Sequence, residues 1–66
     1  MITSIFVDKA TNKVVRSLQM HEPYLIDTAE EFSFAVEGVM HFDFSAFEYV
    51  YKDGHIQRFE KNLENG

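Results

Sequence analysis

The sequence predicts a small α+β domain: a twisted antiparallel β-sheet of four to five strands with one short α-helix, in ββαββ order. Residues 2–7 and 13–20 are rich in β-branched and apolar side chains that alternate with period two. Residues 39–59 alternate in the same way, and a helix-capping signature lies between these two regions. The chain has 66 residues, so we expect one domain over residues 1–61 and a frayed tail over residues 62–66.

The first two predicted strands are expected to form a hairpin. Their connector, residues 8–12, contains Asp and Asn, which favour turns. Ile2 and Phe6 lie on one face of the first strand. Ile5 and Val7 lie on the other face, so both faces are partly apolar. This pattern predicts a central position for the first strand.

Residues 29–37 have two interpretations. Thr28 is followed three positions later by Glu31, which is the signature of a capping box at the start of a helix. Such a helix would cover the sheet through Phe32 and Val36. The same stretch also alternates as a strand would, and periodicity alone does not decide between the two. We favour the helix because the capping signature is the more specific signal.

The last third of the chain predicts a long strand followed by a hairpin. Residues 39–51 alternate, with a change of phase at residues 45–46 that indicates a bend or bulge. A three-residue loop with Gly54 in the left-handed conformation would then place Val50 opposite Ile56.

Charge is distributed unevenly along the chain, whose formal net charge is −5. Residues 1–16 hold three basic residues and one acidic residue, whereas residues 17–51, the acidic segment, hold seven acidic residues and no basic one. The acidic residues of this segment are Glu22, Asp27, Glu30, Glu31, Glu37, Asp43 and Glu48. Such a segment repels nucleic acid and anionic membranes and attracts basic surfaces. It is either a solvated face or a recognition surface for a basic protein.

Aromatic residues make up 15% of the chain, with seven Phe and three Tyr. So many rings are hard to bury in a domain of this size, so we expect an aromatic patch at the surface, which a partner or a second copy in a homodimer would cover. Phe47, Tyr49 and Tyr51 share one face of a predicted strand and are the candidates, although core packing is the simpler role for them. Few cations surround these rings, so direct nucleic-acid binding is not expected.

The residue types required for common catalytic and metal sites are sparse. The chain has no cysteine, and its glycines are isolated, so thiolate metal sites and phosphate-binding loops are absent from the sequence. His41, Asp43 and His55 form at best a weak cluster, and His21 is distant from the other histidines. We expect no metal, no cofactor and no enzymatic activity.

No apolar run approaches the ~18–20 residues that span a bilayer, and no basic signal-peptide region precedes the first apolar stretch, so we expect a cytoplasmic protein without membrane contact. Our hypothesis is a small non-enzymatic acidic binding protein, in its sharpest form a DNA-mimic inhibitor that covers the nucleic-acid-binding surface of a basic partner. The alternative is a structural or assembly subunit that self-associates through exposed aromatic rings and sheet edges.

Overall fold

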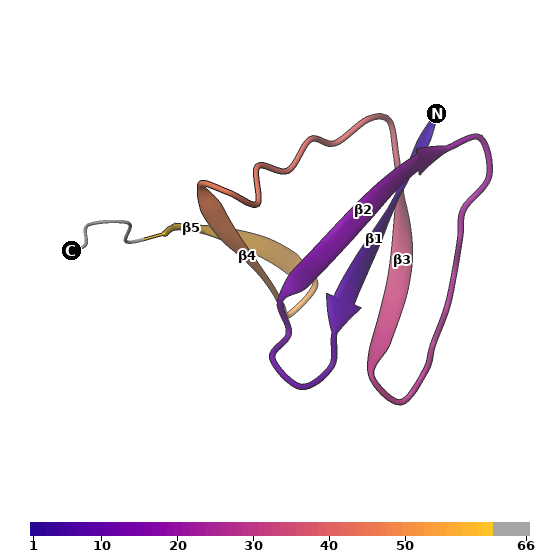
Figure 1. Ribbon diagram of the computed structural model, residues 1–66. Helices are drawn as coiled ribbons and strands as arrows, with labels where there is room; N and C mark the ends of the chain where they lie inside the picture. Colours follow the sequence, from indigo (N-terminus) through magenta and orange to yellow (C-terminus); the bar gives the residue numbers. More distant parts are fainter. Residues whose placement is uncertain (62–66) are drawn as a thin grey trace.

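Five β-strands in two antiparallel sheets make up the computed structural model, which describes residues 1–61. The strands are β1 (Ile2–Asp8), β2 (Val14–Met20), β3 (Glu31–Glu37), β4 (Phe47–Lys52) and β5 (His55–Glu60). The first sheet has the order β2-β1-β3, and the second is the hairpin β4–β5 (Figure 1). The described residues contain no helix, so the fold is all-β and the α+β prediction is wrong. The expected tail, residues 62–66, lies outside the described part of the chain.

The first strand lies at the centre of its sheet, as its two apolar faces predicted. It pairs with β2 on one side and with β3 on the other. Ile5 and Val7 are fully buried on the face that packs against the β4–β5 hairpin. Burial of each such side chain contributes about 1.5–3 kcal/mol. The predicted β1–β2 hairpin is also confirmed: Asn12 adopts a φ of 62°, and the Asp8 carboxylate accepts hydrogen bonds from Thr11.

Two buried hydroxyl groups of β1 hold the connecting segments against opposite faces of the sheet. Thr3 Oγ1 donates to the Gly38 carbonyl at 2.8 Å and accepts from the Met40 N–H at 3.0 Å. Ser4, which lies on the other face, accepts from the Tyr24 N–H at 2.9 Å. Buried hydroxyl groups require such partners, so the polar positions of β1 determine where the two long connections run.

The segment predicted as a helix is strand β3. The capping signature does form locally, since Thr28 Oγ1 accepts from the Glu31 N–H at 3.1 Å. It closes a tight turn, after which Phe32 bridges back to Asp27. In the strand, the side chains of Phe32, Phe34 and Val36 all pack against the core. This packing stabilises the strand more than the capping signature stabilises a helix, because a helix of about nine residues is only marginally stable by itself.

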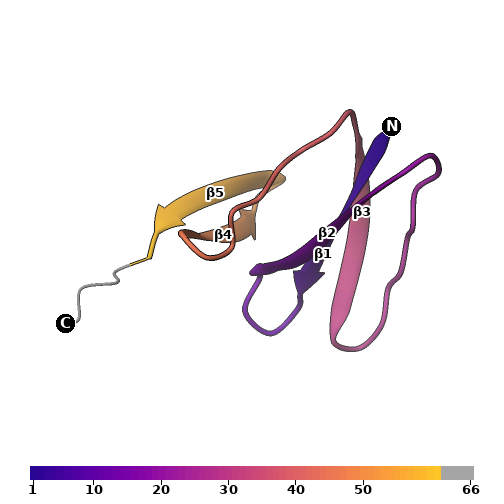
Figure 2. The ribbon, with the colours of Figure 1, turned by 45° about the horizontal axis from the view of Figure 1, so that its top comes forward.

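The β4–β5 hairpin covers the face of the sheet that the helix was expected to cover. Tyr49 is buried there, and Tyr51 packs at 5.7 Å and 5.0 Å against the rings of Phe32 and Phe34. Residues 38–46 run as an irregular connection from the end of β3 to the start of β4, as Figures 1 and 2 show. The single long strand predicted over residues 39–51 is therefore wrong.

The loop between β4 and β5 has two residues, not three. Asp53 and Gly54 have φ angles of 54° and 80°, which is the backbone of a type I′ turn. Tyr51 consequently lies opposite Ile56. The predicted register, with Val50 opposite Ile56, is wrong by one residue. A type I′ turn matches the natural twist of the strands, and this preference outweighs the better side-chain matching of the other register.

One outer strand, β3, is covered along its edge by another segment of the chain, whereas the edges of other outer strands are not. Residues 24–27 run along β3, where the Ser33 N–H donates to the Ile26 carbonyl at 3.0 Å. Within residues 1–61, no strand pairs with the outer edge of β5. The outer edge of β2 meets β4 only at its beginning, where Lys13 bridges to Val50. Unpaired edges invite a further strand, so β5 presents an open edge, and β2 and β4 present open edges away from this bridge.

Candidate functional site

Three of the seven carboxylates of the acidic segment form ion pairs with the basic residues of the N-terminal hairpin. The pairs are Lys9–Asp27 at 2.6 Å, Lys13–Glu48 at 3.4 Å and Arg16–Glu31 at 3.1 Å. The fold brings the two segments together because β3 and β4 lie beside the hairpin that β1 and β2 form. All three pairs are partly exposed, so each contributes about 0–1 kcal/mol. The charge separation seen along the sequence is thus partly neutralised in space.

The other four carboxylates have no Lys, Arg or His nitrogen within 4.0 Å in the described part of the chain. They are Glu22, Glu30, Glu37 and Asp43. Each of these residues is exposed. These four are therefore the members of the acidic segment that present negative charge to the solvent.

Glu22 and Glu37 lie at the same end of the three-stranded sheet. Ile2 pairs with Met20 of β2 on one side and with Glu37 of β3 on the other. Glu22 follows Met20 by two residues, so the two carboxylates flank the same end, which we call the acidic end. Across three strands the separation of the outer backbones is about 9–10 Å. Glu30 lies at the opposite end of the sheet, since its neighbour Glu31 pairs with Asp8.

Asp43 has a structural role in the connection between β3 and β4. Its Oδ1 accepts from the Ser45 hydroxyl at 2.7 Å and from the Ser45 N–H at 3.3 Å. These hydrogen bonds favour the charged carboxylate, and the Ser45 hydroxyl is the largest influence that lowers the pKa of Asp43 below its ordinary value of 3.8. The same residue donates its backbone N–H to the Tyr49 hydroxyl at 3.0 Å. Asp43 therefore stays charged while it shapes the loop.

Most of the cations are engaged within the molecule. Besides the three that form ion pairs, the Arg58 guanidinium lies 4.4 Å from the centre of the Phe47 ring. Lys61 Nζ donates to the Phe44 carbonyl at 2.6 Å. These contacts hold the positive charges close to the protein surface. The carboxylates of Glu22 and Glu37 make no hydrogen bond or ion pair within residues 1–61, which makes the acidic end the more accessible charged surface.

The three rings considered as an interaction patch lie at different depths. Tyr49 is only 8% exposed and is surrounded by other rings of the core. Tyr51 is half-buried against β3, and Phe47 is half-buried beneath the Arg58 guanidinium. The aromatic rings that reach solvent furthest are Tyr24 and Phe59, each 50% exposed. Neither follows from the alternation that singled out the three strand residues.

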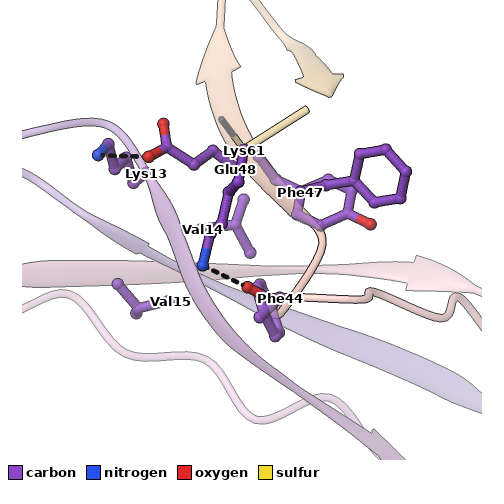
Figure 3. A pocket seen from close by; sticks show the side chains of 8 residues that line it. Lys13, Val14, Val15, Phe44, Phe47, Glu48 and Lys61 are labelled. Atoms are coloured by element: carbon purple, nitrogen blue, oxygen red, sulfur yellow. Dashed lines mark hydrogen bonds and ion pairs between the residues drawn. The ribbon is translucent and has the colours of Figure 1, made fainter. Parts of the chain in front are cut away.

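A shallow groove of about 220 Å³ lies between β2 and β4. Figure 3 shows its lining, with Lys61 reaching toward the Phe44 carbonyl and Lys13 paired with Glu48. Small-molecule sites usually enclose about 300–1,000 Å³, so this groove has room for a single large side chain and too little for a cofactor.

The histidine and carboxylate cluster considered from the sequence does not assemble. No group of three or more His, Asp or Glu residues in residues 1–61 is arranged to hold a metal ion. His55 pairs with Lys52 at the hairpin turn, whereas His41 lies in the connection after β3. Residues 1–61 also contain no helix long and apolar enough to cross a membrane.

Reasoning from the sequence missed the three ion pairs and the groove. The opposite charges of residues 1–16 and the acidic segment were a signal for the pairs, but only strand register determines which residues meet. Nothing in the sequence indicated that β2 and β4 would diverge. No family model, curated protein or solved structure matches this chain, so its own geometry is the basis for a functional proposal.

Proposed function

We propose that this protein is a non-enzymatic binding module that engages a basic protein through its acidic end. In its most specific form, it inhibits a nucleic-acid-binding protein by covering the surface that would otherwise contact phosphates. The observation that carries this proposal is that negative charges are more accessible to a partner than positive ones. Four carboxylates of the acidic segment are exposed and unpaired within residues 1–61, whereas three basic residues are held in ion pairs and two more in other contacts.

Exposed carboxylates act on a basic partner mainly during encounter. Complementary charges raise the association rate and are screened over roughly 8–10 Å at physiological ionic strength. Glu22 and Glu37 are suited to this role because Glu37 ends β3, Glu22 follows β2 by two residues, and neither forms an ion pair within residues 1–61. A partner that normally binds the closely spaced negative charges of nucleic acid has the complementary surface.

The test uses two double variants with the same change in charge. Glu22→Gln/Glu37→Gln removes two charges from the acidic end, and Glu30→Gln/Glu60→Gln removes two exposed charges elsewhere. Each form is immobilised and exposed to cell lysate at low and high salt, and captured proteins are identified by mass. Labelled DNA on the captured protein is then titrated with each form.

Under this proposal, the wild type and the Glu30/Glu60 variant displace DNA, and the Glu22/Glu37 variant does so about tenfold less effectively at low salt. Glutamine preserves the shape of the side chain, so the difference reports charge. Equal displacement by the two variants, or DNA that stays bound at saturating wild type, would mean that the acidic end is only a solvated face.

The open edges of β2 and β5 favour a second candidate function, self-assembly. Residues 24–27 protect the edge of β3, whereas no described strand protects these two. Two copies of β2 related by a twofold axis at Leu18 would place Leu18, which is 41% exposed, opposite its own copy. Such a homodimer would extend the three-stranded sheet across two molecules.

A further inference from the structure

The groove between β2 and β4 arises because the two strands meet at one point and then diverge. At the meeting point Lys13 bridges to Val50, and the Tyr51 N–H donates to the Asn12 carbonyl at 2.8 Å. Beyond it, β2 and β4 separate into the V that Figure 1 shows. The groove of about 220 Å³ lies along this opening. Within residues 1–61, the outer edge of β2 is therefore left without a partner strand along this groove.

The β2 side of the opening can accept a strand. Beyond the bridge at Lys13, no strand of residues 1–61 pairs with the outer edge of β2. An extended peptide can add to such an edge through main-chain hydrogen bonds, while pockets for alternate side chains supply specificity. Val15 is 47% exposed at this edge and lines the groove.

The lining of the groove combines apolar surface with positive charge. Val14, Val15 and Phe47 provide the apolar part, and Lys13 and Lys61 are the basic members. Glu48 balances Lys13, whereas the acceptor for Lys61 is the neutral Phe44 carbonyl. The Arg58 guanidinium over the Phe47 ring adds a further positive charge beside the groove. The groove therefore favours a negatively charged ligand, although the chain as a whole is acidic.

We propose that this groove binds an extended acidic segment of a partner protein, which pairs with β2 and inserts one large apolar side chain beside Val15 and Phe47. Side chains two residues apart in a strand share a face at a spacing of about 6.6–6.8 Å. We assign one carboxylate two residues before the apolar side chain and one two residues after it to Lys61 and Lys13, since these positions share its face of the strand. This site is separate from the acidic end, and it recognises a partner of opposite charge.

The probe is the peptide acetyl-Glu-Thr-Phe-Thr-Glu-amide, titrated into the ¹⁵N-labelled full chain at low salt. Binding shifts the amide signals of Val14, Val15 and Phe47 and leaves those of Glu22 and Glu37 unchanged. Replacement of Phe by Ala in the peptide weakens binding at least tenfold, because most of the buried apolar surface is lost. Replacement of both Glu by Lys weakens it by about two- to fivefold for each lysine contact that is lost.

Two valine variants provide the matched control. Val15→Glu places a negative charge in the groove, and Val39→Glu places the same charge at a similarly exposed position, 51% against 47%, outside it. The Val15 variant loses binding and the Val39 variant retains it. Equal affinity of the two variants, equal affinity of the Glu and Lys peptides, or no shift at millimolar peptide overturns the proposal. Groove signals that move with protein concentration alone would assign the groove to a second copy and overturn it as well.

Discussion

The Tyr49 hydroxyl accepts a hydrogen bond from the backbone N–H of Asp43 at 3.0 Å, which joins the connection after β3 to the centre of the aromatic core. Tyr49 is buried to 8% exposure, and the rings of Phe42 and Phe44 pack edge-on against it at 4.8 Å and 5.6 Å. An irregular segment is thereby fixed over the core by one polar atom and two ring contacts.

Removal of this hydroxyl should destabilise the protein without changing its packing. Tyr49→Phe is expected to lower the free energy of unfolding by about 0.5–1.5 kcal/mol, the net contribution of a typical hydrogen bond. Urea denaturation measures the change. Tyr24→Phe is the control, because Tyr24 is 50% exposed and its hydroxyl has no hydrogen-bond partner in residues 1–61. Equal losses in both variants would contradict the role assigned to Tyr49.

The turn between β4 and β5 requires a left-handed backbone at Gly54, so a substitution there should destabilise the fold. Gly54→Val should lower the free energy of unfolding by about 1–3 kcal/mol, because a β-branched residue is strained at a φ of 80°. A Cβ atom there would meet no atom within 4 Å, so the loss reports strain and not a clash. Asp53→Asn should change little, since Asn tolerates the left-handed conformation. An unchanged denaturation midpoint for Gly54→Val would argue against this turn.

The Ser45 hydroxyl predicts a change in the titration of Asp43. Ser45→Ala should raise the pKa of Asp43 toward its ordinary value of 3.8, because the largest influence that lowers it is removed. A lowered pKa in the folded state stabilises the protein above the ordinary value, and this stabilisation is lost as the pH falls through the folded-state pKa. The two forms should therefore differ in stability at neutral pH and converge in acid. NMR titration of the Asp43 carboxyl is the measurement, and identical titration curves would refute the assignment.

The open edge of β2 makes self-assembly testable through Leu18. If two copies pair along β2, the wild type should sediment at micromolar concentration with a mass above the 7.7 kDa of one chain. Leu18→Lys should restore the single-chain mass, because charge on an edge strand blocks pairing. Val39→Lys is the control, because Val39 is 51% exposed in the connection after β3 and lies on none of the open edges. A wild type that sediments as one chain at all concentrations would exclude this candidate function.

The positions of the strands could largely be predicted from the sequence, but the choice between helix and strand at residues 31–37 could not. Thr28 and Glu31 make the same local hydrogen bond at the start of a helix and in a tight turn. The outcome depends on the packing of Phe34 against Tyr51, at a ring separation of 5.0 Å between residues 17 positions apart. Such non-local contacts override local signals, and no single-sequence pattern contains them.

The candidate site could also be predicted only in part from the sequence. Composition alone identified the acidic segment, because charge can be counted without a structure. The pairing of Arg16 with Glu31 could not be predicted, because it requires β2 and β3 to flank the same central strand. The groove beside Val15 depends on the angle between β2 and β4, to which a bulge at the start of β2 contributes.

The central position of β1 means that the beginning of this chain cannot be trimmed. The terminal residues of most domains tolerate deletion or fusion because few contacts hold them. Here the Met1 carbonyl accepts the Gly38 N–H at 2.8 Å, and Ile2 already pairs on both sides. Loss of residues 1–4 would remove the part of β1 that pairs with Leu18–Met20 and Ala35–Glu37, together with the Thr3 and Ser4 hydroxyls that hold the two long connections. Proteolysis within the first four residues should therefore loosen both long connections as well as the end of the sheet.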